Sequence, residues 1–270
     1  MEKVVLFCKS YRGDLDRVKV QFESITKHNK DNIPYYICIP REDESLFRDK
    51  LGKGNYNIIF EDDVAKTDSK NKNGHYTQQI YKLMFAFKNI SEFYFLMDSD
   101  SHFIRDFGIE DFFTPDGVPY ITMHECKDLL ELSKVIKGDD TLNEWFKGER
   151  LKIMDIFGRK GKLYDYSGSG SILFSSKVIK ELKKQYMDPN KLSFQDLLDY
   201  CTSENTWVGE FLLQSKCIEF MPCAPPFKTF HYVEQYQLAK QLGLTQESFS
   251  VNYLGITLQS NWGAPLTYED

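Results

Sequence analysis

The first half of the chain alternates short apolar runs with longer segments of mixed polarity. The apolar runs predict strands, and they lie at residues 4–8, 34–39, 56–60 and 93–97. The segments between them predict helices with polar or glycine-rich ends, at residues 14–28, 42–51 and 75–89. Strands that alternate with helices are typical of an α/β fold, in which helices flank a mostly parallel sheet.

The second half is less regular. Strands are predicted at residues 118–123, 171–175 and 217–221, and the polar and aromatic stretch 137–168 predicts a lid or substrate wall. Three prolines within 222–227 predict a break in regular structure, followed by one helix near 234–242 and then mostly loop. No repeat or linker divides the chain, so we expect a single domain over 1–270 that consists of two halves, 1–105 and 106–270.

Composition narrows the classes of function. The chain has 270 residues, 41% of them hydrophobic, and a formal net charge of −6, which argues against nucleic acid as a partner. No long apolar run predicts a membrane span or a signal peptide, so we expect a cytoplasmic protein. The six cysteines form no C-x-x-C pair, and we expect buried free thiols rather than a zinc site or a catalytic cysteine.

Two aspartates directly follow the apolar run FYFLM. Side chains two residues apart on a strand point to the same side, so Asp98 and Asp100 are predicted to face one volume at the carboxyl end of the sheet, where α/β folds bind ligands. Unneutralised carboxylates repel each other, and a hard divalent cation such as Mg²⁺ or Mn²⁺ removes that repulsion. The alternative is a pair of aspartates that closes a turn.

The D-x-D pattern alone carries little information, because D-L-D also occurs at residues 14–16, where it is predicted to cap a helix. The helix 75–89 adds context. Its apolar stripe predicts a core-facing side, whereas Gln78, Gln79 and Lys82 share another side that either faces solvent or faces a site.

The segments GHYTQQIYKL and FLMDSD together resemble the metal-dependent glycosyltransferases of the GT-A fold, and most closely a bacterial capsule-associated group of them. SENTWVGEF, at residues 203–211, resembles a later segment of that group. The resemblance implies that residues 1–105 bind a nucleotide sugar, with a UDP-sugar expected, and that residues 106–270 bind the acceptor and carry a C-terminal extension.

The resemblance also implies roles for individual residues. Asp98 and Asp100 are expected to hold Mn²⁺ or Mg²⁺ at the donor diphosphate, with Asp100 as the direct ligand. The third ligand is expected to be His231, with His102 as its rival. Expected donor-binding residues are Lys9, Ser10, Tyr11, Arg12, Gln78, Gln79, Lys82 and Asp98.

Three carboxylates of the second half are candidates for a general base, namely Glu204, Glu210 and Asp165. Glu204 is preferred because it lies in the matched S-E position, although a carboxylate at the start of a helix is the simpler interpretation. Residues 168–171 predict either a tight turn or a close approach to an acceptor sugar. Trp262 is either a sugar platform or an anchor for the tail.

The expected function is therefore the transfer of a sugar from a nucleoside-diphosphate sugar to a glycan or lipid-linked glycan acceptor, in the synthesis of a bacterial capsule or other surface polysaccharide. The basic segment 177–186 either contacts anionic lipid at the inner face of the membrane or is a solvated helix. The alternatives are a nucleotide-sugar-binding protein without activity and a D-x-D phosphatase. The latter normally carries its motif at the first strand, whereas three predicted strands precede Asp98.

Overall fold

The computed structural model describes residues 1–66 and 74–268, without the side chains of His75 and Ser169. Its centre is a five-stranded sheet in the order β3-β2-β1-β4-β7. The strands are β1 (Glu2–Lys9), β2 (Tyr35–Ile39), β3 (Asn57–Phe60), β4 (Ser91–Met97) and β7 (Ser171–Ser175). All neighbours are parallel except β4 and β7. The predicted α/β class with a mostly parallel sheet is confirmed, and the second half of the chain contributes an edge strand.

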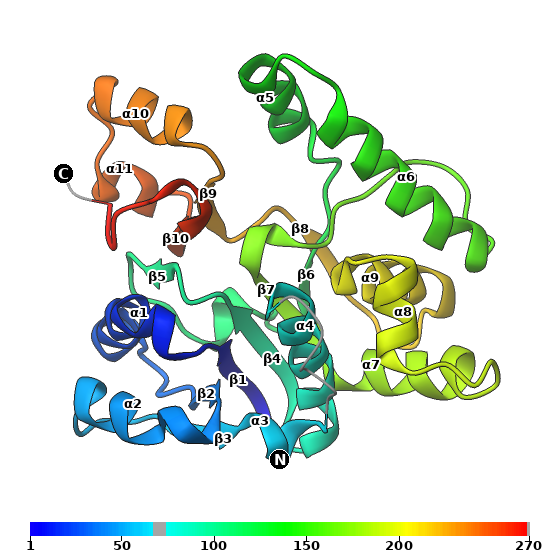
Figure 1. Cartoon of the computed structure of the whole chain (residues 1–270), viewed down its shortest axis with the longest axis horizontal. Coiled ribbons are helices and arrows are strands. Elements are labelled where there is room, and N and C mark those ends of the chain that lie inside the picture. The colour runs from blue at the N-terminus through cyan, green and yellow to red at the C-terminus, as the bar shows by residue number, and fades with distance from the viewer. Residues whose placement is uncertain (67–73, 269–270) are drawn as a thin grey trace.

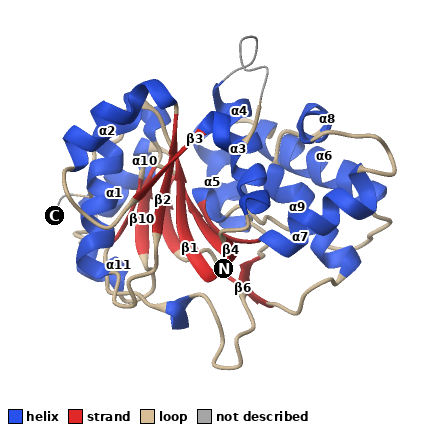
Figure 2. Cartoon of the chain, turned by 90° about the horizontal axis from the view of Figure 1, so that it is seen from below, coloured by secondary structure: helices blue, strands red, loops and turns tan. Residues whose placement is uncertain are grey.

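Helices cover both faces of this sheet (Figure 2), with α1 and α2 on one side and α4 and α7 on the other. Three helices of the first half follow the prediction closely, namely α1 (Leu15–His28), α2 (Glu44–Leu51) and α4 (Gly74–Met84), and a short helix α3 (Glu61–Val64) that the sequence does not predict follows β3. A 3₁₀ turn extends α4 through Phe85–Lys88. One large core joins the sheet to these helices, and the strands β1, β2, β4 and β7 contribute most of their residues to it, whereas β3 at the edge is only half-buried.

The stretch 137–168, predicted as a lid or wall, is largely helical. Two helices, α5 (Lys127–Lys137) and α6 (Thr141–Ile156), project from the sheet (Figure 1). In α6 the buried positions Phe146, Ile153 and Met154 follow helical spacing, and the buried polar residues Glu149 and Arg150 complete the same face. Because this face mixes apolar and charged residues, the helical periodicity of α6 is not visible in the hydrophobic pattern of the sequence.

The prediction of a strand at 217–221 is wrong. Lys216 ends the preceding helix in the left-handed conformation, and the strand β8 begins only at Met221, covering Met221–Cys223. It pairs with β6 (Tyr120–Thr122) alone. Pro222 is tolerated there because a strand with one partner leaves its other edge without ladder bonds.

The tail is more regular than predicted. The strands β9 (Phe227–Phe230) and β10 (Gly255–Leu258) form a three-stranded sheet with β5 (Ser101–Phe103). A second small core lies between this sheet and two helices. The remaining helices of the described chain are α7 (Ser176–Leu182), α8 (Phe194–Tyr200), α9 (Glu204–Ser215), α10 (Val233–Gln241) and α11 (Gln246–Ser250).

All six cysteines are free thiols, four buried and two half-buried, as expected from their positions in apolar runs. None of the helices that the structure describes combines the length and the apolar character that crossing a bilayer requires.

Candidate functional site

Asp98 and Asp100 lie in a tight turn between β4 and β5. The backbone N–H of Ser101 donates to the carbonyl of Asp98 at 3.1 Å, which closes the turn. From α1, the buried amide of Gln21 donates to the carbonyls of Asp98 (2.7 Å) and Ser101 (2.9 Å), and Tyr35 donates to the Gln21 side chain at 2.6 Å. The turn is therefore fixed by buried hydrogen bonds.

The two carboxylates face a cavity of about 260 Å³ at the carboxyl ends of β1 and β4. We call it the carboxylate cavity, and its lining residues are Lys9, Asp14, Gln78, Asp98, Ser99, Asp100, Thr257, Gln259, Ser260 and Asn261. The aspartates thus belong to a turn and also line a cavity, so the two interpretations of the motif are compatible. Asp14 adds a third carboxylate, although its sequence context predicts only that it caps a helix.

Lys82 is the charge partner of Asp98. Its ammonium lies 2.7 Å from Asp98 Oδ1 and 3.9 Å from Glu204 Oε1, and the lysine is only 5% exposed. Burial lowers the pKa of Lys82, but the carboxylates of Asp98 and Glu204 outweigh burial and leave that pKa raised. Lys82 is therefore a charged, buried ammonium that neutralises part of the negative charge at the turn.

Asp100 and Asp14 are less well compensated. Burial, and next the charge of Asp98, raises the pKa of Asp100 to about 6, although the backbone N–H of Ser260 donates to its Oδ2 at 3.0 Å. Burial also raises the pKa of Asp14. A raised pKa means that the folded protein disfavours the charged carboxylate. The carboxylate cavity therefore carries excess negative charge, which a bound cation would relieve.

A second cavity of about 300 Å³ adjoins the first and shares Asp98 and Gln259 with it. We call it the Glu204 cavity. Its polar lining includes Gln79, Lys82, Asp98, Arg150, Asp165, Glu204 and His231, and its apolar wall comes from α5 and α6 through Leu129, Leu130, Leu142, Trp145 and Phe146. Gln78, Gln79 and Lys82 thus face cavities, so the polar side of α4 is not a solvated face.

Glu204 begins α9, as predicted, after the N-cap residue Ser203, whose hydroxyl accepts from the backbone N–H of Thr206. The glutamate is 4% exposed, and burial raises its pKa despite the nearby Lys82. Of the other two candidate bases, Asp165 lines the Glu204 cavity but is bound by Arg150 at 2.7 Å. Glu210 is completely buried, where Arg159 and Tyr166 donate to it, and it lines neither cavity among those described.

Glycine at 170 permits the close approach of the 168–170 turn to the aspartates. Its carbonyl accepts from the Asp98 backbone N–H at 2.9 Å, its φ is +101°, and a Cβ there would lie 2.5 Å from Asp98 Oδ2. A side chain at this position is excluded by both the conformation and the space. The glycine-rich segment is therefore a turn that packs against Asp98.

The donor-binding candidates after β1 divide into two groups. Lys9 lines the carboxylate cavity, where it pairs with Glu61 at 2.7 Å, and Ser10 is buried beside it. Arg12 binds the buried Asp43 through its side chain (2.6 Å) and its backbone N–H (2.8 Å), and Tyr11 is 52% exposed. Arg12 thus anchors the loop to α2, and neither residue is in the described lining of the cavity.

His231 lines the Glu204 cavity rather than the carboxylate cavity, and burial lowers its pKa to about 4. Its rival His102 is buried in β5 and lines neither cavity. Among the described histidines, cysteines and acidic residues, neither histidine forms a compact group of three with Asp98 and Asp100. A cation at Asp98 and Asp100 would have to complete its coordination from water or substrate.

Trp262 serves as an anchor in this structure, since its indole donates to the carbonyl of Phe230 at 3.0 Å and its ring packs against Tyr236. The sequence alone does not predict that Asp14 and the segment 257–261 join the site. A short polar stretch after β10 gives no local signal, because it joins the site only when β10 pairs with β5.

The sequence model of a family of unknown function, DUF6492, matches residues 4–146, just over half of the chain. The match contains β1, β4 and the Asp98 turn but ends before Glu204. No curated protein matches the chain.

Proposed function

This chain belongs to the DUF6492 family, and we propose that it is a metal-dependent glycosyltransferase of the GT-A type, which transfers a sugar from a nucleoside-diphosphate sugar to a glycan acceptor. The observation that carries the proposal is the placement of Asp98 and Asp100 in one cavity at the carboxyl ends of two neighbouring parallel strands. Ligands of open α/β sheets bind at that edge.

The residues of the carboxylate cavity fit Mg²⁺ or Mn²⁺. These cations take oxygen ligands, and Mg²⁺ is commonly held by one or two carboxylates together with substrate phosphates and water. Asp98 Oδ1 accepts from Lys82 and Asp100 Oδ2 accepts from the backbone N–H of Ser260, so within the described part of the chain the second oxygen of each carboxylate is left for a cation. When bound, the cation neutralises charge on the departing diphosphate.

The charge of the cavity supports strict dependence on a cation. Asp14, Asp98 and Asp100 oppose a diphosphate anion, and the ammonium of Lys9 is already paired with Glu61. A nucleoside diphosphate is therefore expected to bind poorly until a divalent cation is present. A UDP-sugar is the preferred donor in this proposal.

The Glu204 cavity is suited to the sugar and the acceptor. It shares Asp98 with the carboxylate cavity, and it combines apolar side chains of α5 and α6 with polar groups, including the buried Nη1 of Arg150, which lacks a hydrogen-bond partner. In the proposed step the acceptor oxygen forms a bond to the anomeric carbon, the bond from that carbon to the diphosphate oxygen breaks, and Glu204 accepts the hydroxyl proton.

The test is a thermal-shift and calorimetry screen of uridine, guanosine, cytidine and thymidine diphosphate sugars, with and without Mn²⁺. We expect one nucleotide class to bind with Mn²⁺ and the donor to be hydrolysed slowly. Absence of binding by every nucleotide, with or without metal, would refute the proposal. Tight binding without hydrolysis or transfer across a broad acceptor panel would indicate a nucleotide-sugar sensor instead.

The role of Glu204 has its own test. Glu204→Gln keeps the shape of the side chain and removes its ability to accept a proton, so turnover is expected to fall at least ~100-fold while the affinity for the nucleotide is retained. Glu181→Gln, on α7 and outside the described lining of both cavities, is a matched control that should change neither turnover nor nucleotide affinity. Undiminished turnover in Glu204→Gln would remove Glu204 from the proposed mechanism.

A further inference from the structure

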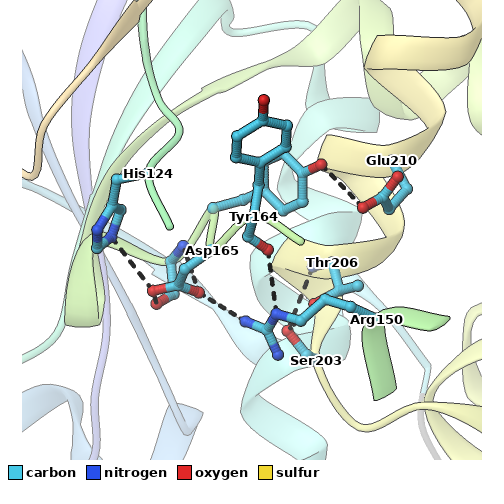
Figure 3. Close-up of polar contacts among 9 residues, drawn as sticks. His124, Arg150, Tyr164, Asp165, Ser203, Thr206 and Glu210 are labelled. Carbon is cyan, nitrogen blue, oxygen red and sulfur yellow. Dashed lines mark hydrogen bonds and ion pairs between the residues drawn. The ribbon is translucent and has the colours of Figure 1, made fainter. Parts of the chain in front are cut away.

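We propose that His124, Cys126 and Asp165 form a second cation site, specific for a borderline-soft ion such as Zn²⁺ and separate from the carboxylate cavity. One potential ligand atom from each of the three lies within 4.8 Å of the other two. Imidazole, thiolate and carboxylate together suit Zn²⁺, whereas Mg²⁺ and Mn²⁺ prefer oxygen ligands. Figure 3 shows the imidazole of His124 directed at the Asp165 carboxylate.

The backbone brings these residues together independently of their side chains. His124 and Asp165 form an antiparallel bridge, in which each N–H donates to the carbonyl of the other, at 3.1 and 2.7 Å. Cys126 follows two residues later with a φ of +58°, at the start of α5. A positive φ is uncommon for cysteine, and such conformations occur often at binding sites.

The distance between two of the ligands fits a metal better than a hydrogen bond. His124 Nε2 lies 3.4 Å from Asp165 Oδ2, and this buried nitrogen has no hydrogen-bond partner among the residues that the structure describes. In a tetrahedral site with bonds of about 2.0–2.1 Å, two ligand atoms are separated by about 3.3–3.4 Å. The pair therefore already has the spacing of one edge of a coordination tetrahedron.

Asp165 also has the outer contacts that a metal ligand requires. Arg150 donates to its Oδ1 at 2.7 Å and Ser167 donates to its Oδ2 at 2.8 Å, which leaves one lone pair of Oδ2 for a cation. Arg150 is itself fixed by the carbonyl of Tyr164 at 3.1 Å (Figure 3). Such outer-shell hydrogen bonds orient ligands and support metal affinity.

The site has a route to solvent and an open position. Cys126 lines the Glu204 cavity and also a larger cavity of about 870 Å³ between α5 and α10, which His124 lines too. Three protein ligands leave the fourth tetrahedral position for water or a small anion. The thiolate of Cys126 and the carboxylate of Asp165 together neutralise the two positive charges of the ion. Arg150 keeps its ion pair with Asp165, because it contacts Oδ1 and leaves Oδ2 to the ion.

The experiment titrates the metal-free, reduced full-length chain with Co²⁺, whose bond to a thiolate produces a charge-transfer absorption in the near ultraviolet. Displacement of Co²⁺ by Zn²⁺, followed by calorimetry, gives the Zn²⁺ affinity. We expect one equivalent of Co²⁺ to produce the band. Cys126→Ser is expected to abolish the band and to weaken Zn²⁺ binding by more than the ~10–100-fold typical of losing an outer-shell partner. Cys223→Ser, a half-buried cysteine in β8, is the matched control and should leave both unchanged.

His124→Gln is a second variant that tests the site without touching the thiol, and it should also weaken Zn²⁺ binding. Absence of the band in the wild-type chain, or its persistence in Cys126→Ser, would overturn the proposal. The outcome is independent of the proposed transferase activity, because Asp100→Asn should keep the thiolate band and Cys126→Ser should keep nucleotide binding in Mn²⁺. Loss of nucleotide binding in every chain, with the band retained, would refute only the proposed function.

Discussion

Replacement of Asp100 by asparagine is expected to stabilise the metal-free protein at neutral and alkaline pH. Asp100 titrates at about 6 in the folded chain, against 3.8 for an unperturbed aspartate, because burial and the charge of Asp98 disfavour its charged form. A pKa difference of one corresponds to about 1.4 kcal/mol. The ionised Asp100 therefore lowers the free energy of unfolding by about 3 kcal/mol at pH 8, and asparagine removes this penalty. The Ser260 N–H can still donate to the asparagine oxygen.

The sign of the pH dependence follows from the raised pKa. The folded state holds the Asp100 proton more tightly than the unfolded state, so the wild-type chain loses stability as pH rises from about 4 through about 6. Urea denaturation in EDTA should therefore show Asp100→Asn more stable than wild type by about 1–3 kcal/mol at pH 8 and equal to it near pH 4. Millimolar Mn²⁺ should raise the stability of the wild type and leave that of the variant nearly unchanged.

Asp106→Asn provides the matched control. Asp106 is exposed, and its hydrogen bond with His28 lowers its pKa, so this variant should gain no stability at pH 8. If Asp100→Asn were less stable than wild type at pH 8, or if its difference from wild type did not change between pH 4 and pH 8, Asp100 would be a structural residue and the electrostatic reasoning would fail.

Three further substitutions test the surroundings of the turn. Lys82→Met leaves Asp98 and the buried Glu204 without their cation, and urea denaturation should show a loss of about 2–4 kcal/mol at pH 8. The loss should diminish as the pH falls, because burial raises the pKa of Glu204 and so favours its protonated form. Gly170→Ala should cost about 1–3 kcal/mol and weaken Mn²⁺-dependent nucleotide binding in calorimetry, since its Cβ would lie 2.5 Å from Asp98 Oδ2. Glu210→Gln should cost about 3–5 kcal/mol by breaking the buried ion pair with Arg159, yet leave the nucleotide affinity of the folded chain unchanged.

The sequence predicts the central sheet well because its strands are buried on both faces. Such strands contain continuous apolar runs, and β1, β2, β4 and β7 all have this character. The helix α6 cannot be predicted from apolar residues in this way, because Glu149 and Arg150 occupy buried positions on its core face. The short strands of the three-stranded sheet also lack an apolar run that would predict them. Ser101 and Thr257 are completely buried there and share a hydrogen bond of 2.8 Å, so polarity conceals their burial.

The candidate site shows the same limit. Asp98 and Asp100 are predictable because an apolar strand directly precedes them. The role of Asp14 cannot be predicted, because helix capping already explains a carboxylate at the start of α1. Only the pairing of β1 with β4 brings Asp14 to the cavity. The ion pair between Lys82 and Asp98 likewise depends on how α4 packs against the sheet, which the spacing along α4 does not specify.

The boundary of the family match separates two parts of the site. Lys9, Asp14, Gln78, Asp98 and Asp100 lie within residues 4–146, so the sheet edge that carries the proposed cation site belongs to the matched region. Later residues complete the surroundings of that edge. The Gly170 carbonyl fixes the Asp98 N–H, β7 covers the edge of β4, Ser260 binds Asp100, and Glu204 adjoins Lys82. The Glu204 cavity draws on both regions, because its apolar wall lies on α5 and α6 up to Phe146, whereas Glu204 and His231 follow the end of the match.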